Sequence, residues 1–154
     1  MTKKEIIKQN QEALKDNPEL ERISGEVMEH MINPKNYGKL VYSNGVGQAV
    51  SPKSNEFANV YIDVEDNIIK DISFGCRSCQ DTTVSGSIFT TMVKGVSVEE
   101  ALSIMKDLEN QIKIAPLKQQ LASKMILKAF ESAVINMENR KIMRDQEMVS
   151  VELS

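Results

Sequence analysis

The sequence predicts an α+β domain in which helices pack on one face of a small antiparallel sheet. Apolar and polar residues alternate over residues 58–64, as is typical of a half-buried strand. Over residues 117–137 apolar residues recur at three- and four-residue steps, which predicts one long amphipathic helix. Strands therefore come first and helices after, and a length of 154 residues fits one domain with its own core.

The N-terminal part of the chain is predicted to contribute one helix to this fold. Residues 1–23 are assigned as a helical extension, and Pro18 suits the first turn of a helix. Asn33, followed by a proline, ends this helix. The only histidine, His30, lies near the end of the helix, where we expect it to pack against the fold rather than bind a metal ion.

The predicted sheet lies in the middle of the chain. Residues 33–55 contain several glycines and prolines, and they are expected to form loops that join one or two short strands. Residues 58–64 form the first regular strand and residues 68–74 the next, with a turn at residues 65–67. Two strands joined by so short a turn are expected to pair as an antiparallel hairpin.

Two further helices are expected before the long one. Asp81 or Thr82 can cap the first of them, and Gly95 follows its predicted end. Ser97 and Glu100 have the spacing of a capping box, which predicts the start of the second helix.

The C-terminal half ends the predicted domain. Pro116 suits the start of the long helix. The main domain is assigned to residues 24–140, and residues 141–154 are expected to form a frayed tail, because the apolar pattern is lost there.

The composition excludes several classes of protein. A formal net charge of −3 and a pI near 5.3 leave no basic surface for nucleic acid. No apolar run is long enough for a membrane span or a signal peptide, so we expect a cytoplasmic protein with no membrane partner. A single histidine and the lack of Ser/His/Asp or phosphate-binding glycine patterns argue against an enzyme, beyond sulfur transfer through a thiol.

Both cysteines lie between the second predicted strand and the helix that follows it. Cys76 and Cys79 are three residues apart, a spacing that lets two sulfur atoms hold one metal ion. A thiol close to a helix N-terminus is also biased toward the reactive thiolate. The structural alternative is that both cysteines are small core residues, since free cysteine is among the most buried residue types.

Several short motifs occur in an order that carries a family resemblance. They are Val27-Met28-Glu29-His30, Asn33-Pro34-Lys35-Asn36-Tyr37-Gly38, Gly45-Val46-Gly47, Ser51-Pro52, Val93-Lys94-Gly95, Glu99-Glu100-Ala101-Leu102 and Ala115-Pro116-Leu117-Lys118. Over about residues 24–137 the chain resembles the NifU N-terminal or IscU-like family of iron–sulfur cluster assembly scaffolds. The resemblance implies a three-stranded antiparallel sheet with helices on one side.

The family's chemistry depends on three cysteines and an aspartate, with a histidine beside the third cysteine. The resemblance places Ser54 at the first cysteine and Glu56 at the aspartate. Counting back from the Val-Lys-Gly motif places Cys79 at the second cysteine, so that Cys76 is an addition. Gln120 and Leu121 occupy the histidine and third cysteine positions, and Leu121 lies on the apolar stripe of the long helix, which predicts core packing.

The resemblance therefore implies a reduced ligand set, in which Cys76 and Cys79 bind the cofactor and Glu56 completes the metal ligands. The implied cofactor is a 2Fe-2S cluster or zinc. One chain offers two thiolates and a carboxylate where a conventional cluster site uses four protein ligands. A homodimer would supply four thiolates.

Three functions follow from these residues. The first is a scaffold-like protein in iron–sulfur cluster assembly that binds a cluster or a metal ion through the CxxC pair. The second is a thiol or persulfide relay that uses the same pair, and the third is a metal-free module that binds a partner. By resemblance the partners are a cysteine desulfurase and an Hsp70-type chaperone, which binds a family segment similar to residues 115–118.

Overall fold

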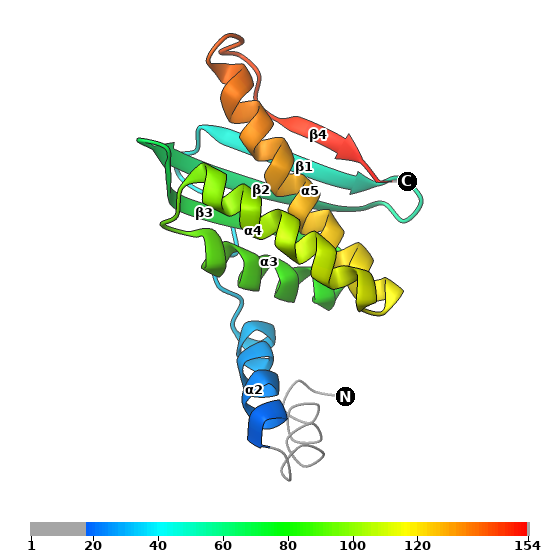
Figure 1. The fold of residues 1–154 in the computed structure, drawn as a ribbon. Coiled ribbons are helices and arrows are strands. Elements are labelled where there is room, and N and C mark those ends of the chain that lie inside the picture. Colours follow the sequence, from blue (N-terminus) through cyan, green and yellow to red (C-terminus); the bar gives the residue numbers. More distant parts are fainter. Residues whose placement is uncertain (1–17, 154) are drawn as a thin grey trace.

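The computed structural model describes the backbone of residues 18–153 and consists of one sheet covered by helices (Figure 1). Strands β1 (Gly45–Ser51), β2 (Glu56–Glu65) and β3 (Ile68–Arg77) pair antiparallel, and β4 (Val149–Glu152) adds to β1 in parallel. The strand order is β3-β2-β1-β4. Together with the helices this confirms the predicted α+β class.

The predicted hairpin is present as β2 and β3. The alternating side chains of Ala58, Val60 and Ile62 are completely buried, whereas their neighbours are partly exposed. Asp66 and Asn67 form the turn with positive φ angles of 52° and 64°, a backbone conformation that these two residue types tolerate. The alternation of apolar and polar residues in the sequence therefore corresponds to one buried face of the sheet.

The C-terminal tail differs from the expectation. The sequence predicts a frayed tail over residues 141–154 and a three-stranded sheet, but β4 makes the sheet four-stranded. The amide of Leu153 donates to the carbonyl of Val50 at 2.8 Å, and Val151 packs against the core. The physical reason is that β1 would otherwise present an unpaired edge, and β4 pairs with its residues 47–50.

Helix α5 (Leu117–Arg140) lies directly against β1 on the buried face of the sheet. Gly45 and Gly47 permit this close approach: a Cβ at Gly47 would overlap the carbonyl oxygen of Ala129 and the amide nitrogen of Ala133. Asn136 adds a polar link, since its buried Oδ1 accepts the amide of Val46 at 2.9 Å. The long apolar stripe predicted for this helix thus forms the centre of the core.

Two shorter helices complete the cover of the sheet. Helix α3 (Gln80–Val93) has Cys79 as its N-cap, so the cap lies two or three residues before the predicted Asp81 or Thr82. Helix α4 (Val98–Gln111) begins as predicted, with the Ser97 side chain accepting the amide of Glu100 at 3.1 Å. Residues 112–114 continue as a short 3-10 helix before α5.

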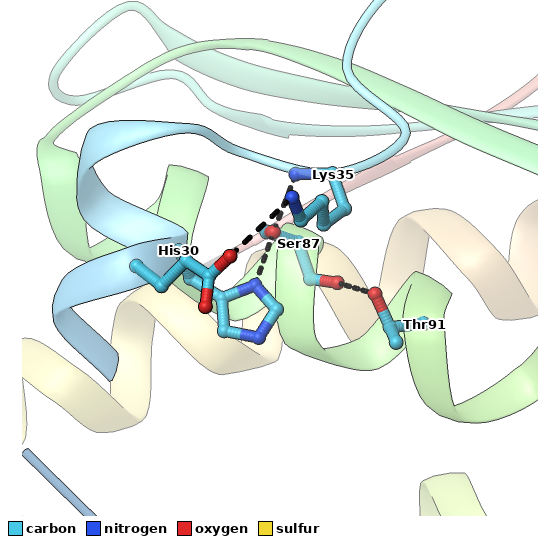
Figure 2. Close-up of polar contacts among 5 residues, drawn as sticks. His30, Lys35, Ser87 and Thr91 are labelled. Atoms are coloured by element: carbon cyan, nitrogen blue, oxygen red, sulfur yellow. Dashed lines mark hydrogen bonds and ion pairs between the residues drawn. The ribbon is translucent and has the colours of Figure 1, made fainter. Parts of the chain in front are cut away.

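Helix α2 (Pro18–Ile32) begins and ends where the sequence predicts. Figure 2 shows how its end contacts α3: His30 Nδ1 lies 2.5 Å from Ser87 Oγ, and the Lys35 amide donates to the same oxygen at 2.7 Å. Lys35 also pairs with Glu29 at 3.7 Å. His30 therefore packs the end of α2 against α3, which agrees with the structural role expected for it.

Part of the predicted N-terminal extension, residues 1–17, lies outside the described residues. Within residues 18–153, each helix is too short or too polar to cross a membrane.

The contact between α5 and β1 predicts a large loss of stability for Gly47→Ala. The added methyl group must displace helix backbone, so we expect the free energy of unfolding to fall by about 3 kcal/mol, the upper end for overpacking. Urea denaturation measures this change. Gly75→Ala in β3 is the matched control, because a Cβ there meets no atom within 4 Å. Equal losses for the two variants would contradict this account of the contact.

Candidate functional site

A pocket of about 320 Å³ lies where the ends of several elements meet. Its walls come from the end of β1 and the following turn, the start of β2, the β3 to α3 turn, the first turns of α5 and the C-terminal end of the chain. The lining residues are Ser51, Ser54, Glu56, Ser78, Cys79, Thr82, Lys118, Leu121, Ala122, Met125 and Leu153. Thiol, carboxylate, hydroxyl and ammonium groups therefore share one cavity with an apolar wall.

The family ligand positions implied by the resemblance converge on this pocket. Ser54, Glu56, Cys79 and Leu121 all line it, although they are far apart in the sequence. Gln120 does not line the pocket. Its side-chain amide nitrogen donates to the carbonyl of Ala115 at 2.6 Å. Leu121 is 49% exposed, so the prediction that it packs in the core is wrong. It forms part of the pocket wall instead.

The turn that carries Ser54 and Glu56 has a special backbone. Asn55, between them, has a positive φ of 57°, in the left-handed region that favours glycine. Asparagine is the residue type that most readily replaces glycine there. The turn directs residues 54 and 56 to the same pocket.

Cys79 has the features of a reactive thiol. It is the N-cap residue of α3, and its Sγ lies 3.6 Å from Thr82 Oγ1. Burial acts to raise the pKa of the thiol. Hydrogen bonds from the Thr82 hydroxyl and from the amides of Thr82 and Asp81 outweigh it, so the pKa of Cys79 is lowered. The positive end of the helix favours the same anion.

Cys76 has a different environment. It lies near the end of β3 opposite Ala58 of β2, packs against the core, and its Sγ contacts Thr83 Oγ1 at 3.3 Å. Burial raises the pKa of the Cys76 thiol, and the neighbouring Cys79 acts in the same direction, against the hydrogen bond from Thr83. Cys76 does not line the pocket. The core-residue alternative therefore fits Cys76, whereas Cys79 faces the cavity.

Two hydroxyl groups connect Glu56 with Cys79. Ser78 Oγ donates to Glu56 Oε2 at 3.0 Å and lies 2.9 Å from Thr82 Oγ1, which in turn contacts the sulfur of Cys79. We call Ser78 and Thr82 the hydroxyl bridge. The sequence does not predict either residue as part of the site. The only signal was their position, since Ser78 lies inside the CxxC motif and Thr82 one helical turn after Cys79.

The donors of the pocket do not make a complete metal site in one chain. Among the described residues, no three His, Cys, Asp or Glu side chains come together as a group that could hold a metal ion. The ligands that the resemblance implies are divided, because Cys79 and Glu56 line the pocket and Cys76 does not. One thiol and one carboxylate fall short of the four ligands of a conventional 2Fe-2S site.

Lys118 supplies the positive charge of the site. It is the first lysine of α5, and its ammonium group lies 4.0 Å from Asp81 Oδ2. Because the side chain is mostly exposed, this pair is weak and leaves the ammonium group available at the rim of the pocket.

Comparisons with known proteins identify relatives of this chain. Residues 22–144 match the family model described as NifU-like N terminal domain. The iron-sulfur cluster assembly scaffold protein IscU 1 of Archaeoglobus fulgidus is 39% identical over 84 residues, which cover 54% of this chain and 55% of that protein. The IscU scaffold protein of Aquifex aeolicus is 32% identical over 81 residues, which cover 51% of this chain and 52% of that protein. The chain thus spans about half the length of these curated relatives.

A solved structure shares the fold. The N-terminal part of a nitrogen-fixing NifU-like protein from Brucella abortus superposes with a TM-score of 0.61 at 16% identity. The match covers 74% of this chain and 92% of that one. At this identity the similarity concerns the fold alone.

The two thiols are predicted to react at different rates. The lowered pKa of Cys79 leaves a larger thiolate fraction near neutral pH, and the raised pKa of Cys76 leaves a smaller one. We therefore expect iodoacetamide to alkylate Cys76→Ser, which retains Cys79, faster than Cys79→Ser at the same pH. Mass spectrometry of quenched samples measures both rates. Equal rates, or a faster Cys76, would contradict the assignment.

Proposed function

Since the chain belongs to the family of NifU-like N-terminal domains, we propose that it takes part in iron–sulfur cluster assembly and that Cys79 accepts sulfur in the pocket. The observation that carries this proposal is the position of Cys79, the cysteine that lines the pocket and the one whose pKa is lowered. A cysteine desulfurase is the proposed sulfur donor.

The proposed reaction is a transfer of sulfane sulfur. The Cys79 thiolate attacks the outer sulfur of the donor persulfide, a bond forms between the two sulfur atoms, and the sulfur–sulfur bond of the donor breaks. The donor leaves as a thiolate and Cys79 becomes a persulfide. No external oxidant or reductant is needed, because the outer sulfur keeps its oxidation level during the exchange.

This proposal favours the relay function over binding of a whole cluster through the CxxC pair of one chain. A relay needs one accessible thiol, and the half-buried Cys79 lines the pocket. A cluster held by one chain needs further ligands, and Ser54 and Leu121 stand at two of the family cysteine positions. In this proposal the chain keeps the scaffold fold and passes sulfur on to the assembly.

The start of α5 is the proposed contact for a chaperone of the Hsp70 type. Leu117 is 70% exposed and the preceding Ile114 is 94% exposed, so apolar surface lies beside the pocket rim. The segment Ala115-Pro116-Leu117-Lys118 is therefore accessible to a partner.

The proposal predicts which cysteine carries sulfur. After anaerobic incubation with a cysteine desulfurase and cysteine, wild-type protein and Cys76→Ser should each carry about one sulfane sulfur per chain. Cys79→Ser should carry almost none, because its remaining thiol lies outside the pocket. Intact-mass spectrometry before and after reduction measures the gain of one sulfur atom. Full loading of Cys79→Ser would contradict the proposal.

A further inference from the structure

The C-terminal segment contributes one wall of the pocket. Strand β4 runs along β1 (Figure 1), and Leu153, the residue after β4, lines the pocket together with Ser51, the last residue of β1. The family model matches residues 22–144, so this wall comes from a part of the chain outside the match. We call residues 146–153 the strap.

The start of the strap is fixed to α5 by three side chains. The side-chain amide of Asn136 donates to the carbonyl of Gln146 at 3.2 Å and to its Oε1 at 3.0 Å. Asn139 donates to the same Oε1 at 3.1 Å, and Arg140 Nε donates to the Gln146 carbonyl at 2.9 Å. Asn136 is completely buried, so water does not compete for its hydrogen bonds. Gln146 is therefore the anchor of the strap.

The rest of the strap directs Leu153 toward the core side of the sheet. Val149 and Val151 are partly buried, whereas Ser150 and Glu152 are exposed. Successive side chains of a strand point to opposite faces, so Leu153 continues the series of the two valines. Val151 and Leu153 both pack against the core. The Leu153 side chain is thus set by the register of β4.

Leu153 differs from the exposed side chains that line the same pocket. Ser54, Lys118 and Leu121 are exposed, whereas Leu153 is partly buried. The amide of Leu153 also donates to the carbonyl of Val50 at 2.8 Å, which holds its backbone on β1. A packed leucine on a fixed backbone cannot swing aside as an exposed lysine can. Leu153 therefore narrows the pocket without adding a charge or a hydrogen bond near Cys79.

Building on the proposed sulfur transfer at Cys79, we propose that the strap limits the width of the groups that reach Cys79, with Leu153 as the specificity-determining residue. A narrow sulfur donor passes Leu153, whereas a wide thiol is excluded. A thiol that reached the outer sulfur of a Cys79 persulfide would take that sulfur as its own persulfide and release Cys79 as a thiolate. The strap therefore retains sulfur on Cys79 against wide thiols.

The test compares two uncharged maleimides of different width on Cys76→Ser protein, which retains Cys79. N-ethylmaleimide is narrow, and N-(1-pyrenyl)maleimide is wide. Both react with the same thiolate, so the ratio of the wide-reagent rate to the narrow-reagent rate is independent of the thiolate fraction. Cys79 and the hydroxyl bridge are unchanged in every variant. Mass spectrometry of quenched samples measures both rates.

The rate ratio should follow the size of residue 153. Leu153→Ala should raise it about tenfold, which corresponds to the loss of a steric barrier of about 1.4 kcal/mol for the wide reagent alone. Leu153→Phe should lower it. Gln146→Ala lies outside the pocket and releases the strap from α5, so it should also raise the ratio. Ser150→Ala is the matched control: it removes an exposed hydrogen bond to Gln48 and should leave the ratio unchanged.

Three results would overturn the proposal. An unchanged ratio in Leu153→Ala would show that the leucine does not limit access. Equal acceleration of both reagents would show a general change at Cys79 rather than selection by width. An unchanged ratio in Gln146→Ala would show that the anchored strap has no part in the effect. Should Leu153→Ala not fold, Leu153→Phe decides, because a ratio that does not fall contradicts the proposal.

The maleimide assay needs no sulfur donor, so it decides the width limit separately from the sulfur-transfer function. If Cys79 accepts no sulfur from a desulfurase but the ratio responds to residue 153, the proposed function fails and the width limit stands. If sulfur is accepted and the ratio does not respond, only the width limit fails.

Discussion

The close contact between α5 and β1 fixes the wall that α5 contributes to the pocket. Gly45 and Gly47 have no side chains, so the helix backbone near Ala129 and Ala133 rests directly on the strand. This contact fixes the position of a helix that is 24 residues long. Its first turns then project over the end of the sheet, where Lys118 forms part of the pocket wall.

Two cysteines three residues apart have different chemistry because they lie on opposite sides of the turn between β3 and α3. Cys76 belongs to β3, and its sulfur contacts Thr83 and packs on the core. Cys79 follows the turn, caps α3 and faces the pocket. Burial of a thiol favours its protonated form, whereas amide groups at a helix start favour the thiolate. The strand-to-helix turn therefore separates one structural thiol from one reactive thiol.

The sequence predicts those parts of the fold that depend on local patterns. The alternation at Ala58, Val60 and Ile62 predicts the hairpin, because one face of β2 is buried. The capping spacing of Ser97 and Glu100 predicts the start of α4. Strand β4 is missed because its four residues gain stability from pairing with the distant β1 and from packing on the core.

The site is less predictable than the fold. The resemblance identifies Glu56 and Cys79, and the structure brings them to one pocket. Ser78 and Thr82 are not identified, because a hydroxyl acquires a role only through the groups it contacts, and Glu56 is 22 residues away from Ser78. Leu121 is misassigned for a related reason: the apolar stripe of α5 extends beyond the core and ends in the pocket wall.

The central claim is that one chain handles sulfur at Cys79 and lacks the ligands to hold a whole cluster. The most direct test is the iron and acid-labile sulfide content of the monomer, isolated without oxygen after incubation with iron, cysteine and a cysteine desulfurase. The account predicts sulfane sulfur on the monomer without a matching amount of iron. A monomer that carries one stable 2Fe-2S cluster, lost on replacing either Cys76 or Cys79 by serine, would contradict it.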